Sequence, residues 1–168
     1  KLMKNAHSLK IKILEIPLVD SSSMKNEKDE EELITNLKEI TQDAKDLGIL
    51  ICLETDYQPK KILKLLEKID NDNFVINYDT GNSAALGFNP KEELTITGKY
   101  IKNIHIKDRK LHGNTVPFGD GDVNFDLFFS TLKNIDYKGD LILQGARIEN
   151  ENPEITYMKY RDFVMGYI

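Results

Sequence analysis

The stretch GILICLETDYQPKKILKLLEKIDNDNFVINYD, residues 48–79, contains two apolar runs separated by a segment with helical periodicity. The runs at 49–56 and 73–79 are short and rich in β-branched and aromatic residues, which is typical of buried strands. Pro59 stands where a helix can begin. One face of the helix that would follow carries four apolar residues, Ile62, Leu65, Leu66 and Ile69. The stretch therefore predicts a strand–helix–strand unit with parallel strands.

The same alternation extends over the rest of the chain. We expect strands over residues 11–20, 49–56, 73–79, 101–108 and 139–147. We expect helices over residues 29–48, 59–70, 124–137 and 152–168, with Gly48 ending the first and Asn124 capping the third. Residues 82–100 are less regular and predict one short helix, and the GDG triplet at 119–121 predicts a turn.

Five βα units fit either an open, doubly wound α/β sheet or most of a (β/α)8 barrel. The chain lacks the glycine-rich motifs G-x-G-x-x-G and G-x-x-x-x-G-K-[ST], which are typical of nucleotide-binding open sheets. A complete barrel needs about 250 residues, so a chain of 168 residues would hold only about the last five βα units. We therefore expect residues 1–168 to be the C-terminal portion of a single TIM-barrel domain, and the native protein to be longer at its N-terminus.

Composition narrows the possible environments and partners. The formal charge of −5 without a basic block argues against nucleic-acid binding. No apolar run approaches the ~20 residues that span a bilayer, and the opening segment KLMKNAHSLK lacks the apolar core of a secretion signal. A single cysteine, Cys52, excludes an internal disulfide and suits a small buried hydrophobe. We expect a cytoplasmic protein without membrane contact.

Polar residues mark the end of every predicted strand. They are Asp20, Glu54, Asp79, His105 and Gln144. Such a residue is often only a helix cap or a loop hydrogen-bonder, but the carboxyl ends of parallel strands meet at one edge of the sheet, where α/β proteins place their sites. Two carboxylates, an imidazole and an amide oxygen could hold one divalent cation there. The oxygen donors favour manganese or magnesium, and the histidine also admits zinc or cobalt.

Several short motifs resemble one known family. They are LET at 53–55, NYDTGN at 77–82, HIKD at 105–108, VPFGDGDVNFD at 116–126 and YKGDLIL at 137–143. Together they resemble the C-terminal part of the xylose isomerase-like sugar-phosphate isomerases and epimerases, nearest to the hexulose-phosphate isomerase and ketose-phosphate 3-epimerase branch. The resemblance implies a (β/α)8 barrel with a divalent metal held by a glutamate, an aspartate, a histidine and a second glutamate. The first three match Glu54, Asp79 and His105.

Gln144 occupies the place of the second glutamate. In the related epimerases both glutamates bind the metal and move protons on opposite faces of the substrate carbon. An amide can offer oxygen to a metal, but it cannot accept a proton. This departure weakens the prediction of an epimerase. Isomerisation through an enediolate needs only one base, and Glu54 could serve.

These observations predict a metal-dependent isomerase of a small sugar or sugar phosphate, with Glu54 and Gln144 as the catalytic residues and Gln144 acting as a neutral ligand or hydrogen-bonder. The expected substrate contacts are Asn82, Lys107, Arg109 and Arg147, and the resemblance favours Lys107 for a phosphate. A sugar-phosphate 3-epimerase and a non-catalytic sugar-binding relative stay open as alternatives. An apurinic endonuclease is disfavoured, because its three-zinc site needs several histidines. Exposed sheet edges of an incomplete barrel would also favour a homo-oligomer.

Overall fold

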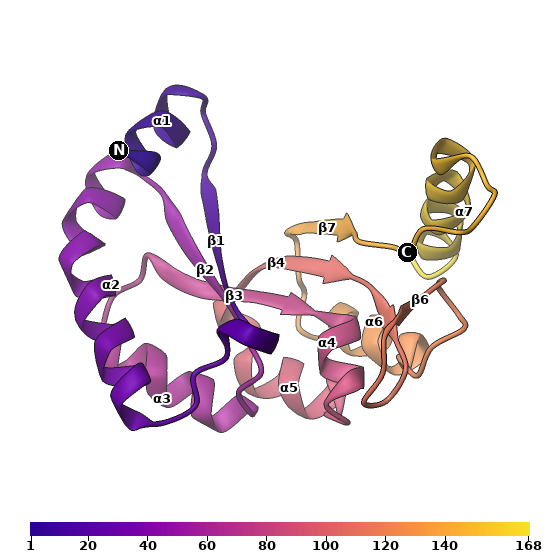
Figure 1. The fold of residues 1–168 in the computed structure, drawn as a ribbon, viewed down its shortest axis with the longest axis horizontal. Helices are drawn as coiled ribbons and strands as arrows, with labels where there is room; N and C mark the ends of the chain where they lie inside the picture. The colour runs from indigo at the N-terminus through magenta and orange to yellow at the C-terminus, as the bar shows by residue number, and fades with distance from the viewer. The chain divides into compact units, whose positions relative to one another are not determined.

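The computed structural model describes residues 1–168 and divides the chain into two compact units (Figure 1). The first unit contains Lys1–Asn77 together with Tyr100–Lys102. The second contains Tyr78–Lys99 and Asn103–Ile168. Strands β3 (Phe74–Asp79) and β4 (Ile101–Ile106) each begin in the first unit and end in the second.

The first unit is built from βα repeats. Its elements are α1 (Leu2–Ser8), β1 (Ile13–Leu18), the 3-10 turn η1 (Asp20–Ser22), α2 (Glu27–Leu47), β2 (Leu50–Thr55), α3 (Pro59–Ile69) and the start of β3. β1 pairs with β2 and β2 with β3, both in parallel. These elements confirm the predicted strands and helices of this half within a few residues, whereas the sequence did not indicate α1.

Local chemistry explains where these helices begin and end. The Asn26 side chain caps α2 by accepting a hydrogen bond from the Asp29 backbone nitrogen. Gly48 ends α2 in the left-handed region at a φ of 61°, where glycine carries no steric penalty. The predicted apolar face of α3 is buried. Cys52 is buried in β2, and burial raises the pKa of its thiol to about 12, as expected for an inert apolar residue.

The second unit holds the end of β3, most of β4 and the elements between and after them. They are α4 (Thr80–Ala85), α5 (Pro90–Thr97), the 3-10 turn η2 (Gly98–Tyr100), β5 (Asp108–Arg109), β6 (Thr115–Val116), α6 (Phe125–Asn134), β7 (Asp140–Leu143) and α7 (Pro153–Met165). β4 and β7 pair in parallel, and β5 and β6 form a small antiparallel ladder. Aromatic rings fill the core of this unit. For example, Phe125 and Phe163 make an edge-on contact with their ring centroids 5.1 Å apart.

The strand order is β1-β2-β3-β4-β7. This parallel sheet with intervening helices confirms the predicted α/β class and all five predicted strands. β7 is shorter than predicted, because pairing with β4 stops at Leu143. Residues 82–100 form two helices where we predicted one. None of the helices combines the length and apolar character needed to cross a membrane.

The loop around the GDG triplet is ordered by one buried carboxylate. Asp108 is 1% exposed and accepts backbone hydrogen bonds from Gly119, Gly121 and Val123. Burial raises the pKa of Asp108, and these backbone hydrogen bonds oppose the rise. A Cβ at Gly121 would lie 1.8 Å from Asp108 Oδ1, so this position has room only for glycine. The predicted turn is thus an anchored loop.

Candidate functional site

Glu54 lies near the C-terminal end of β2 and is 6% exposed. Its Oε2 accepts a hydrogen bond of 2.7 Å from Asn77 Nδ2. The register that pairs Leu53 with Ile76 explains the contact, since residues 54 and 77 follow directly on neighbouring strands. A buried carboxylate oriented by an amide can take part in metal binding or proton transfer.

A second carboxylate, which the sequence reasoning missed, lies beside Glu54. Glu15 of β1 has a carboxylate oxygen within 4.8 Å of one of Glu54. Glu15 pairs in register with Cys52 and Pro17 with Glu54, so both glutamates project from the same face of their strands. The signal was present in the sequence, because Glu15 is the only charged residue of the strand ILEIPL.

Asp79 is the last residue of β3, and its two carboxylate oxygens have different contacts. Oδ1 accepts a hydrogen bond of 2.8 Å from the Asn82 backbone nitrogen and thereby caps α4. Oδ2 lies 3.8 Å from His105 Nδ1 and 3.5 Å from Lys107 Nζ. The helix cap fixes the orientation of the carboxylate, and this orientation turns the second oxygen toward an imidazole and an ammonium group.

Lys107 follows β4 and reaches Asp79 across a glycine. A Cβ at Gly81 would lie 2.8 Å from Lys107 Cγ, so the lysine stem packs directly against this backbone. The Lys107 side chain is 18% exposed, which leaves it accessible to a small ligand. The structure therefore brings together three of the predicted site residues, Asp79, His105 and Lys107, within the second unit.

Arg109 contacts the protein through three hydrogen bonds. Its Nη1 donates to Asn82 Oδ1 at 2.7 Å, and its Nε and Nη2 both donate to the Gly113 carbonyl oxygen. Arg109 thereby orients Asn82, another predicted substrate contact, and ties it to the loop after β5. These bonds use three of the N–H groups that we expected to bind the substrate.

Gln144 directly follows β7, and its backbone nitrogen donates to the Ile106 carbonyl oxygen at 2.8 Å. The pairing of β7 with β4 ends at Leu143, and strand alternation puts residue 144 on the side of Ile142, the partner of His105. Arg147 lines a small pocket of about 250 Å³ beside Tyr157. Asp20, which the sequence placed at the exit of the first strand, is exposed in η1.

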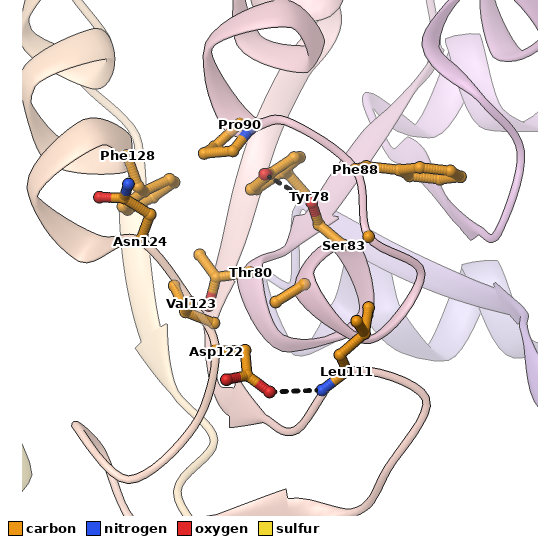
Figure 2. Close-up of a pocket in the computed structure, with 12 residues that line it drawn as sticks. Tyr78, Thr80, Ser83, Phe88, Pro90, Leu111, Asp122, Val123, Asn124 and Phe128 are labelled. Carbon is orange, nitrogen blue, oxygen red and sulfur yellow. Dashed lines mark hydrogen bonds between the residues drawn. The ribbon is translucent and has the colours of Figure 1, made fainter.

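The second unit also contains a pocket of about 350 Å³ (Figure 2). Tyr78 and Ser83 lie in its wall, and both donate hydrogen bonds to the buried Glu93 carboxylate. Burial raises the pKa of Glu93 to about 7, whereas the Ser83 and Tyr78 hydrogen bonds oppose the rise. This buried acid was not predicted, because KEELTIT reads as an ordinary amphipathic helix.

The donor set suits a hard or borderline divalent cation. Carboxylate oxygens and a histidine nitrogen are the usual protein ligands of manganese, magnesium and zinc. Asp79 and His105 already lie close together in the second unit. Glu54 and Glu15 form the carboxylate pair of the first unit.

Comparison with known proteins agrees with this organisation. A family model described as a xylose isomerase-like TIM barrel matches residues 1–158. The L-ribulose-5-phosphate 3-epimerase UlaE of Salmonella paratyphi A is 31% identical over 134 residues, which cover 76% of this chain and 47% of that protein. The chain thus spans about half the length of this curated relative.

Solved structures share the fold at lower identity. The structure of the IolI protein with a bound zinc atom superposes with a TM-score of 0.82 and 21% identity, covering 99% of this chain and 66% of that chain. The D-allulose 3-epimerase of Methylomonas sp. in complex with D-allulose gives a TM-score of 0.73 at 19% identity, covering 94% of this chain and 58% of that chain. These likenesses confirm the predicted TIM-barrel fold.

Proposed function

The chain belongs to the xylose isomerase-like TIM-barrel family, and we propose that it is the C-terminal portion of a barrel enzyme that isomerises a small sugar or sugar phosphate through an enediolate. The observation that carries the proposal is the position of Asp79 Oδ2 beside both His105 and Lys107. The similarity to a sugar-phosphate epimerase supports it.

We assign the metal ligands to Glu54, Asp79 and His105, with Gln144 as a neutral fourth ligand. Glu15 adds a carboxylate beside Glu54 and would restore the negative charge that glutamine lacks at position 144. Manganese, magnesium, zinc and cobalt all suit this set, and the relative IolI has been solved with zinc. A bound divalent cation would polarise the sugar carbonyl and stabilise the negative charge of the enediolate.

Glu54 is the proposed base. Its carboxylate would take a proton from the carbon next to the carbonyl and return it to the neighbouring carbon on the same face. The hydrogen bond from Asn77 holds this carboxylate in one orientation. The side chain is largely buried, which shields the reacting carbon from bulk water.

The remaining residues would bind and orient the substrate. Lys107 would place a positive charge against the substrate oxygens near Asp79, or against a phosphate. Arg147 would contact the substrate at the outer edge of the proposed site. Asn82, whose side-chain oxygen is held by Arg109, would also contact the substrate.

A 3-epimerase is the second candidate, because UlaE carries that name at 31% identity. Epimerisation requires an acid and a base on opposite faces of one carbon, and Gln144 cannot supply either. A sugar-binding protein without catalytic activity is the third candidate, because Gln144 cannot move a proton as a glutamate at this position would.

Incubation of the intact protein with Mn²⁺ and L-ribulose 5-phosphate in D₂O separates the candidates. An isomerase gives an aldose product, with deuterium next to the carbonyl carbon. An epimerase inverts C3 and incorporates deuterium there. A binding protein shifts sugar resonances without incorporation. Glu54→Gln should abolish exchange, whereas Glu67→Gln on the exposed face of α3 should not. Exchange that survives Glu54→Gln would contradict the assigned base.

A further inference from the structure

Thr80 joins the ends of two neighbouring strands through its hydroxyl group. Thr80 Oγ1 donates a hydrogen bond of 2.6 Å to the Lys107 carbonyl oxygen and accepts one of 2.9 Å from the Lys107 backbone nitrogen. The residue is 2% exposed. One hydroxyl therefore satisfies both main-chain groups of Lys107, which only a group that is donor and acceptor at once can do.

The two residues joined in this way bear directly on the proposed site. Thr80 directly follows Asp79, and Lys107 lies two residues after His105. The Lys107 stem also packs on Gly81, the residue after Thr80. The side chains of Asp79 and Lys107 face each other at 3.5 Å, and this distance exceeds the 2.7–2.9 Å typical of a closed charge-assisted hydrogen bond.

Thr80 lies in the wall of the pocket of about 350 Å³, between Tyr78 and Val123 (Figure 2). The two hydrogen bonds to Lys107 tie the residue that follows β3 to the residue that follows β4.

We propose that the Thr80 hydroxyl is a positioning group that fixes the Asp79 carboxylate relative to His105 and Lys107, and thereby sets the affinity of the site for a divalent cation. The inference rests on the proposed function, because it assigns Asp79 and His105 to that cation. With the hydroxyl in place, the Lys107 ammonium is kept from closing onto Asp79 Oδ2. Without it, the two strand ends can shift and the ion pair can tighten in competition with the metal.

Two substitutions separate the hydroxyl from the rest of the side chain. Thr80→Val keeps the shape and removes the hydroxyl, and Thr80→Ser keeps the hydroxyl and removes the methyl group. Calorimetric titration of the intact protein with Mn²⁺ should show about tenfold weaker binding for Thr80→Val, the lower end of the effect of losing an outer group that positions metal ligands. Thr80→Ser should stay within about twofold of the wild type. Equal affinity of Thr80→Val and wild type, or equal weakening by both substitutions, would overturn the proposal.

A second measurement keeps this inference separate from the metal assignment. If the wild type binds no Mn²⁺, the proposed function fails, and metal-free crystal structures then decide the role of Thr80. The proposal predicts a changed distance between Asp79 Oδ2 and Lys107 Nζ in Thr80→Val and an unchanged one in Thr80→Ser. An unchanged distance in both would refute it. Should Thr80→Val not fold, Thr80→Ala is the replacement, with the same expected outcomes.

Discussion

Asp79 Oδ2 lies 3.8 Å from His105 Nδ1, and the other oxygen of the same carboxylate caps α4. The cap is a local consequence of the sequence, since Asp79 stands just before a helix. It turns Oδ2 of the carboxylate toward His105 and Lys107, at the end of β4. One residue thus links the start of a helix to the candidate metal site.

Asp79→Asn should separate helix capping from metal binding. Asparagine caps helices as well as aspartate does, so the free energy of unfolding should change little, while the lost charge should weaken Mn²⁺ binding at least tenfold. Asp79→Ala should lose the cap as well, at a further cost of about 1 kcal/mol. Urea unfolding and calorimetry measure the two effects. Retained Mn²⁺ affinity in Asp79→Asn would remove this residue from the ligand set.

Gln144→Glu should strengthen metal binding. A carboxylate at this position adds a negative charge on the sheet face that carries His105, and it restores a proton acceptor. We expect Mn²⁺ affinity to rise about tenfold, the converse of losing a ligand-shell group, and epimerisation at C3 to appear in the D₂O assay. Gln144→Ala is the control and should not bind more tightly. No gain in either property would exclude residue 144 from the site.

Most of the fold follows from local patterns. Apolar runs and helical periodicity predicted all five strands of the sheet, and Gly48 and Asn124 marked a helix end and a cap as expected. Structure that depends on long-range contacts was not predicted. Asp108 organises a loop through backbone groups more than ten residues away, and no local pattern indicates such an anchor.

The candidate site was predicted in part. Strand ends identified Asp79 and His105, because the carboxyl ends of parallel strands meet at one edge. Glu15 was not predicted because it lies inside a strand, whereas the predicted residues lie at strand ends. Thr80 and Gly81 were missed because their importance comes from contacts with Lys107, 27 residues away for Thr80.

Loss of the Asp108 anchor should destabilise the second unit. Asp108→Ala would leave three backbone N–H groups without their acceptor. We expect a loss of about 3 kcal/mol in the free energy of unfolding. Exposed Asp126→Ala on α6 is the control and should cost far less. Equal unfolding midpoints for the two variants would contradict the role assigned to Asp108.

Glu93 should make stability depend on pH. Its pKa is raised by burial from 4.5 to about 7, so the folded state binds more protons than the unfolded state between these values. Stability from this group is complete below pH 4.5 and is lost as pH rises through about 7, by roughly 3 kcal/mol in all.

Glu93→Gln should flatten this part of the pH profile of unfolding, because an amide keeps hydrogen bonding to Tyr78 and Ser83 without titrating. Glu67→Gln, on the exposed face of α3 in the first unit, should leave the profile unchanged. A profile that is the same in Glu93→Gln and wild type would show that Glu93 ionises normally.

Titration of the intact protein with Mn²⁺ by calorimetry measures whether this chain carries ligands for a catalytic divalent cation. We expect saturable binding in the wild type, loss of that binding in His105→Ala, and retention in His112→Ala, which changes an exposed loop histidine. Absence of binding in the wild type, or equal binding in both variants, would contradict this expectation.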